Sequence, residues 1–135
     1  MNGTHTTVIN VEKSDVQIET RLKNACYLLG CGITGGLTSE IRSEDFISLR
    51  YASRWSMQVR LVLGLLEVVT VEVMKDYNSK VLVDGRTVMI HTMTYTPNNR
   101  GCTAVGSILL NQTFDTVEEA LAFYSTRWQL MQETL

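Results

Sequence analysis

The feature of this sequence that most limits its fold is a two-residue alternation that runs from residue 47 to residue 63. Apolar side chains such as Trp55 and Val59 occupy nearly all odd positions, while the even positions up to 60 are mostly polar. Alternation of this kind is typical of a β-strand with one face on the core and one face outward. A single strand of this length is unusual, so we expect a bend or turn near Ser53. A helix over residues 53–66 stays open as an alternative, with a stripe made of Trp55, Val59, Val62, Leu66 and Val69.

The β-branched content favours the strand interpretation. The 135 residues include 14 Val, 7 Ile and 16 Thr, and these residue types fit the pleated surface of a sheet. Further strands are predicted at 68–74 and 102–110. A hairpin is predicted over 80–95, because Asp84-Gly85 suits the positive φ values of a type I′ turn. A second turn is predicted at 96–101.

Helices are predicted at both ends of the sheet. Ser14 and Gln17 form a capping box for a helix over 14–29. A C-terminal helix is predicted with a capping box formed either by Thr116 and Glu119 or by Asp115 and Glu118, and with an apolar stripe that ends at Met131. The sequence therefore predicts one α+β domain over residues 1–135. Its antiparallel β-meander has about five to six strands, flanked by an N-terminal and a C-terminal helix packed on the sheet. Residues 1–13 form either a short first strand at 8–11 or an extended, flexible arm.

The charge balance excludes several classes of partner. Twelve Lys and Arg against 14 Asp and Glu give a formal charge of −2, and a general nucleic-acid binder or an anionic-membrane binder needs a basic excess. The longest apolar run, near residues 61–66, is far too short to span a membrane. Only 19% of residues are charged, below the roughly 25% of soluble domains. A chain this apolar at this size favours a homo-oligomer.

Cysteine and N-terminal features predict a cytoplasmic protein without a metal site. Cys26, Cys31 and Cys102 are an odd count, with no C-x-x-C and no zinc-site spacing. The first 15 residues have neither the basic nor the apolar region of a signal peptide.

Catalytic motifs are absent from the sequence, so we predict no catalytic residues and no cofactor. His91 stands alone in a predicted strand, and such a histidine is more often a packed or surface residue than a general base. Glu67 and Glu72 border or interrupt an apolar strand. If the odd-position parity continued past Gly64, the Glu67 carboxyl would be desolvated as general acids require. If the parity restarts at Gly64, Glu67 is solvated near a strand end, and we favour this second interpretation.

Arginine residues are the strongest functional signal. Arg outnumbers Lys by 8 to 4, and its planar guanidinium suits bidentate binding of phosphate or carboxylate. Arg50, Arg54 and Arg60 share the outward face of the alternating strand, with no acid between them. The alternative is a solvated face whose arginines pair with carboxylates across the sheet. Arg100 in the second turn is a further anion contact, and the neighbouring Tyr95 is predicted to stack on a base.

A glycine-rich stretch at 30–36 follows the predicted N-terminal helix. Backbone N–H groups of Gly32, Thr34, Gly35 and Gly36, together with Arg42, can cradle a phosphate or carboxylate. The stretch lacks the spacing of the P-loop or of the dinucleotide fingerprint, and helix termination also explains its first glycines.

These features predict a non-catalytic binding protein, a sensor or sequestering module for a small anionic ligand such as a nucleotide. We expect its site near a subunit boundary of a homo-oligomer. One alternative is a protein–protein interaction or assembly module. Another is a small cofactor-free lyase or isomerase that uses a carboxylate such as Glu67 or Glu72.

Overall fold

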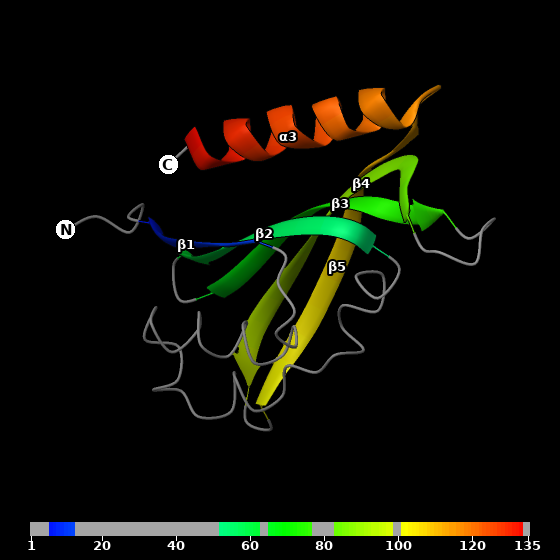
Figure 1. The fold of residues 1–135 in the computed structure, drawn as a ribbon. Helices are drawn as coiled ribbons and strands as arrows, with labels where there is room; N and C mark the ends of the chain where they lie inside the picture. Colours follow the sequence, from blue (N-terminus) through cyan, green and yellow to red (C-terminus); the bar gives the residue numbers. More distant parts are fainter. Residues whose placement is uncertain (1–5, 13–51, 63–64, 77–82, 99–100, 134–135) are drawn as a thin grey trace.

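The computed structural model describes residues 6–12, 52–62, 65–76, 83–98 and 101–133. These residues form one antiparallel sheet and one helix, with the helix lying across one face of the sheet (Figure 1). The elements are β1 (Thr6–Glu12), β2 (Ala52–Val62), β3 (Leu65–Asp76), β4 (Val83–Asn98), β5 (Gly101–Thr113) and α3 (Val117–Glu133).

The sheet is a meander in which each strand pairs with the next one along the chain, in the order β1-β2-β3-β4-β5. The alternating segment forms a strand, not a helix, from Ala52 onward, and its register against β3 shifts between Ala52 and Arg54. This irregularity confirms the expected bend near Ser53, whose hydroxyl donates to the carbonyl of Val73 at 3.2 Å. The antiparallel sheet with a C-terminal helix confirms the predicted α+β character.

The main core lies between the sheet and α3, on the side that we call the helix face. Its buried residues come from β3, β4 and the helix, and Val71, Val73 and Val88 are fully buried. Tyr124 and Trp128 of α3 are 6% and 7% exposed. The apolar stripe predicted for this helix is therefore the side that faces the sheet, because burial of such side chains is the main source of stability for a surface helix.

Local interactions hold α3 in place at its start and along its length. The Thr116 hydroxyl accepts a hydrogen bond from the Glu119 N–H at 3.1 Å, which confirms the predicted N-cap. Further along, the hydroxyls of Ser56 on β2 and Tyr124 are hydrogen-bonded. The Gln58 side chain donates to the carbonyl of Met131 at 3.2 Å. The helix is thus joined to β2 by polar contacts at two levels.

The side chains of the central strands on the opposite face of the sheet are also buried. Alternation along paired strands places Met57, Val59, Leu66 and Val68 on this face, and each is 0% exposed. Odd positions of β2 and even positions of β3 therefore share one face. The parity restarts between the two strands, so Glu67 lies on the helix face, half-buried near a strand end, as the favoured interpretation predicted.

The predicted hairpin at Asp84-Gly85 is wrong. Both residues lie inside β4, which pairs with β3 from Val83 onward across a register shift between Val73 and Lys75. A Cβ on Gly85 would lie 2.4 Å from the Met74 carbonyl oxygen. The glycine is needed here for close approach of two strands, not for a turn.

Several expectations fall outside the described residues. They are the helix over 14–29, the glycine-rich stretch at 30–36, and the structures around Arg42, Arg50 and Arg100. Of the two alternatives for residues 1–13, β1 corresponds to the strand at 8–11, and β3 and β5 confirm the predicted strands at 68–74 and 102–110.

Candidate functional site

Strand β5 is the most exposed element of the sheet. Among the described strands it lies at one edge of the strand order and pairs only with β4. All seven residues from 103 to 109 are exposed. Figure 1 shows β5 beginning at the end of the sheet far from α3 and ending beside the start of that helix, which packs mainly on β3 and β4. An edge strand of this kind offers a row of backbone N–H and C=O groups to another strand.

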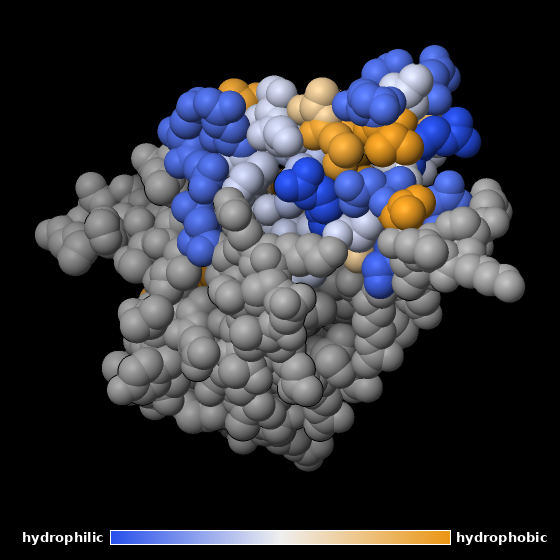
Figure 2. All heavy atoms as spheres, in the orientation of Figure 1, coloured by the Kyte–Doolittle hydropathy of each residue, from blue (hydrophilic) through white to orange (hydrophobic). Residues whose placement is uncertain are grey.

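Three of the exposed side chains of β5 are large and apolar. Val105 is 65% exposed, Ile108 64% and Leu109 61%. Val105 pairs with Thr94 and Ile108 with His91, so the two lie on different faces of the sheet, and Leu109 lies at a register shift. Both faces of the edge are therefore apolar and open. On the side of the molecule drawn in Figure 2, by contrast, apolar groups are bordered by hydrophilic residues, which is normal for a protein surface.

Two of the usual protections against edge pairing, charged residues and proline, are missing from β5, although a register shift lies at Leu109. Native sheets cover or shorten their edges, or place Lys or Pro on them. The 13 residues of Gly101–Thr113 include no charged residue and no proline. This property was visible in the sequence as a strand without a charged face, but the position of β5 at the sheet edge was not.

Two of the predicted anion-binding arginines lie in the described part of the chain, and the structure gives them different environments. Arg54 is exposed, with its guanidinium carbon 5.7 Å from the centroid of the Tyr124 ring, a cation–π distance. Arg60 forms an ion pair with Glu67, its cross-strand neighbour. Partial burial lowers the pKa of Arg60, yet a guanidinium stays protonated at physiological pH. Arg60 is thus neutralised as the alternative interpretation expected, while Arg54 has no carboxylate within ion-pair distance among the described residues.

The predicted stacking of Tyr95 on a ligand base needs correction. Tyr95 pairs with Leu66 in the sheet, and its side chain is 0% exposed. A residue inside the opposite face has no surface on which a base can stack. Tyr95 was expected to be exposed because the sequence placed it at the end of a strand. In the structure β4 continues to Asn98, so Tyr95 lies within the sheet.

Glu72 and His91 form a buried polar pair on the opposite face of the sheet, which the sequence did not predict. Glu72 on β3 is 0% exposed, and its Oε1 lies 3.5 Å from Nε2 of His91 on β4, which is 8% exposed. Among the described residues, neither carboxyl oxygen of Glu72 has a hydrogen-bond partner, and the buried hydroxyl of Thr70 has none either. The sequence had marked Glu72 and His91 separately, but only the β3–β4 register brings them together. Their burial provides no open surface for a substrate.

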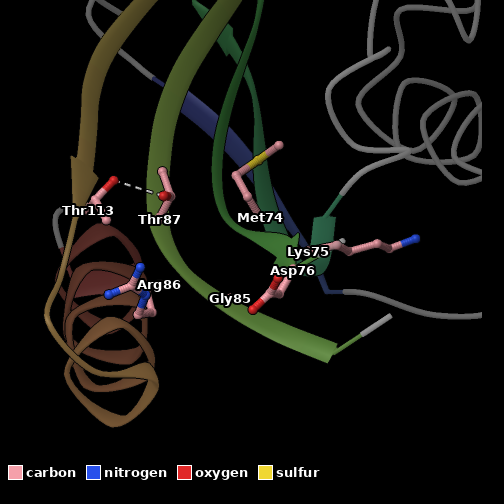
Figure 3. Close-up of a pocket in the computed structure, with 7 residues that line it drawn as sticks. All are labelled: Met74, Lys75, Asp76, Gly85, Arg86, Thr87 and Thr113. Carbon is pink, nitrogen blue, oxygen red and sulfur yellow. Dashed lines mark hydrogen bonds between the residues drawn. The ribbon is translucent and has the colours of Figure 1, made fainter. Parts of the chain in front are cut away.

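A pocket of about 320 Å³ lies at the end of the sheet where β3 ends and β4 begins (Figure 3). Lys75 and Arg86 give it two cations, and the hydroxyls of Thr87 and Thr113 are 2.9 Å apart. The two cationic side chains point away from one another in Figure 3, and Asp76 also lines the pocket. The pocket therefore does not direct two positive charges at one anion.

Among the described residues, no group of three or more His, Cys, Asp or Glu side chains could hold a metal ion. In the same residues, no helix is long and apolar enough to cross a membrane.

The open edge at β5 is thus the feature that distinguishes this surface, and known proteins add no further guide to its use. Comparisons of the chain with protein-family models, with curated proteins and with solved structures found no match.

Proposed function

We propose that this chain is a protein–protein interaction module whose binding surface is the β5 edge of the sheet. The observation that carries the proposal is the charge-free edge strand with Val105, Ile108 and Leu109 each more than three-fifths exposed. The partner contributes an extended segment that adds to the sheet beside β5. Main-chain hydrogen bonds supply affinity in this mode of recognition, and pockets for alternate side chains supply specificity.

The chemistry of β5 defines what the added segment is like. Val105 and Ile108 project from different faces of the sheet, so the partner strand gains apolar contacts on both faces. Strand β5 has no charged side chain that would select a charged partner. The matching segment is an uncharged strand of β-branched or other apolar residues, which favour pleated surfaces.

Binding of a strand-forming peptide tests the proposal. The probe is a labelled peptide with the sequence of Gly101–Thr113, carrying Ser in place of its cysteine and lysines at both ends for solubility. We expect saturable binding to the full chain in fluorescence anisotropy. Ile108→Lys should remove binding, because it places a charge on the docking edge. Leu130→Lys is the matched control, since Leu130 is an exposed apolar residue on α3, 49% exposed. Equal binding by both variants, or no binding by the unaltered chain at concentrations where it is monomeric, contradicts the proposal.

The small-anion function predicted from the sequence remains a prediction. Arg54 is its exposed contact in the described residues, whereas Arg60 is paired and Tyr95 is buried. A lyase or isomerase function would need a carboxylate that reaches a substrate. Glu67 is in an ion pair and Glu72 is fully buried. The described geometry therefore favours the interaction module over both.

A further inference from the structure

We infer that the strand that docks on β5 is the β5 strand of a second copy of this chain, paired antiparallel about a two-fold axis at Ser107. The inference rests on the proposed function of β5 as a docking edge. It adds the identity of the partner, the direction of pairing and the register. The result is a closed dimer in which the two five-stranded sheets join into one continuous sheet.

The first argument is electrostatic. Pairing of a strand with its own copy sets each residue type against a residue of the same strand, so a charged strand would oppose like charges. Gly101–Thr113 has no charge to oppose, although charged residues are present on β2, β3 and β4. The absence of charge on β5 removes the usual obstacle to self-pairing.

The second argument is register. Ser107 is the midpoint of Gly101–Thr113, so an axis at Ser107 lays each strand along the full length of the other, with the register shift at Leu109 as the one irregularity among the described pairs. In this register the exposed side chain of Val105 in each copy lies opposite that of Leu109 in the other copy. Ile108 lies opposite Gly106, where the small residue leaves room for the larger side chain. Every large exposed side chain of β5 then has a place in the interface.

The third argument is closure. Each copy has one β5 edge, and the other edge of the described sheet is β1. A two-fold interface uses the same surface on both copies, so pairing stops at two chains. A head-to-tail contact between β5 and β1 would instead continue into an open filament. The two arrangements predict different masses in solution.

Sedimentation equilibrium of the full chain across the micromolar range tests the inference. We expect a concentration-dependent species of twice the 15.2 kDa monomer mass, and no larger species. Ile108→Lys should shift the equilibrium to monomer, while Leu130→Lys should leave it unchanged. Masses that grow beyond the dimer would overturn the closed pairing.

Disulfide formation tests the register. In a background with Cys26, Cys31 and Cys102 replaced by Ser, Ser107→Cys should form a covalent dimer under mild oxidation. Directly opposed residues in an antiparallel pair have Cα atoms about 4.5–5.5 Å apart, within the range that a disulfide spans. Ser125→Cys, at an exposed position on α3, is the control and should stay monomeric on a denaturing gel. A dimer in sedimentation without the covalent link at Ser107 overturns the register.

The two proposals fail differently. If the full chain stays monomeric at all concentrations but still binds the β5 peptide, the second copy is not the partner and the docking edge stands. If it is monomeric and binds no peptide, both proposals are wrong. Sedimentation of the unaltered chain keeps the inference falsifiable even where the cysteine-free background does not fold.

Discussion

Replacement of Glu72 by methionine should stabilise the protein, because this carboxylate is buried without adequate partners. Glu72 is 0% exposed, and neither of its carboxyl oxygens accepts a hydrogen bond from another residue in the described part of the chain. The imidazole Nε2 of His91 is 3.5 Å from Oε1, beyond a good hydrogen-bond distance. A buried polar atom left unsatisfied costs about 1–3 kcal/mol. Methionine has a similar length and adapts to irregular cores, so Glu72→Met should remove this cost with little loss of packing.

The expected gain is measurable in chemical and thermal unfolding. Glu72→Met should raise the free energy of unfolding by about 1–3 kcal/mol in urea titrations, with an unchanged m value. For a chain of this size each kcal/mol corresponds to about 2–8 °C in Tm. Protein concentration must be the same in all samples, because self-association adds to apparent stability.

Glu67→Met is the matched control, with the same substitution on the same strand. Glu67 is one-third exposed and pairs with Arg60, and such ion pairs contribute about 0–1 kcal/mol. This control should therefore lower stability slightly or leave it unchanged. His91→Leu should act in the opposite direction from Glu72→Met and lower stability, because it leaves the buried carboxyl group of Glu72 without the neighbouring imidazole. A less stable Glu72→Met protein, with the control as expected, would refute the reasoning and show that the carboxylate has a stabilising partner.

Three further predictions concern the helix cap, a strand contact and the arginine face. Thr116→Ala should lower stability by about 1 kcal/mol in thermal unfolding, because the N–H of Glu119 loses its acceptor; no change would mean that water replaces the cap. Gly85→Ala should cost about 1–3 kcal/mol, since its Cβ would meet strand backbone at 2.4 Å. Gly106→Ala should cost less in the same urea titration, since its nearest contact is a flexible methionine side chain; the reverse order would contradict this argument. If the predicted anion site exists, nucleotides should raise Tm by mass action and Arg54→Ala should reduce the rise; no stabilisation by a broad set of phosphorylated compounds would remove that hypothesis.

Patterns of short range in the sequence predicted most of the sheet and the C-terminal helix correctly. Alternation over 54–62 gives a strand because side chains on neighbouring positions must face opposite sides. The cap at Thr116 forms because a hydroxyl reaches an N–H three residues ahead without help from the rest of the fold. Such patterns depend only on residues that are close together in the chain, so they can be recognised in the sequence.

Features that depend on how the strands pair could not be predicted from the sequence. Asp84-Gly85 has the composition of a tight turn, but its role follows from a register shift in the neighbouring strand. Tyr95 is buried because β4 continues past it. Glu72 and His91 stand 19 positions apart and meet only because β3 and β4 pair in this register. The ion pair of Arg60 with Glu67 arises in the same way across β2 and β3.

The exposed edge at β5 leads either to aggregation or to specific pairing with a partner strand. A long, flat and uncharged edge strand that stays unpaired is a site of aggregation, because any exposed strand can add to it. A two-fold dimer removes the edge from solvent and presents only the β1 edges of the two sheets. Introduction of a charge should therefore separate the two behaviours. Ile108→Lys should give a more soluble monomer if the native state is a closed dimer in exchange with monomer. If the edge has no specific partner, the unaltered chain should instead form particles without a defined mass, and the same variant should suppress them.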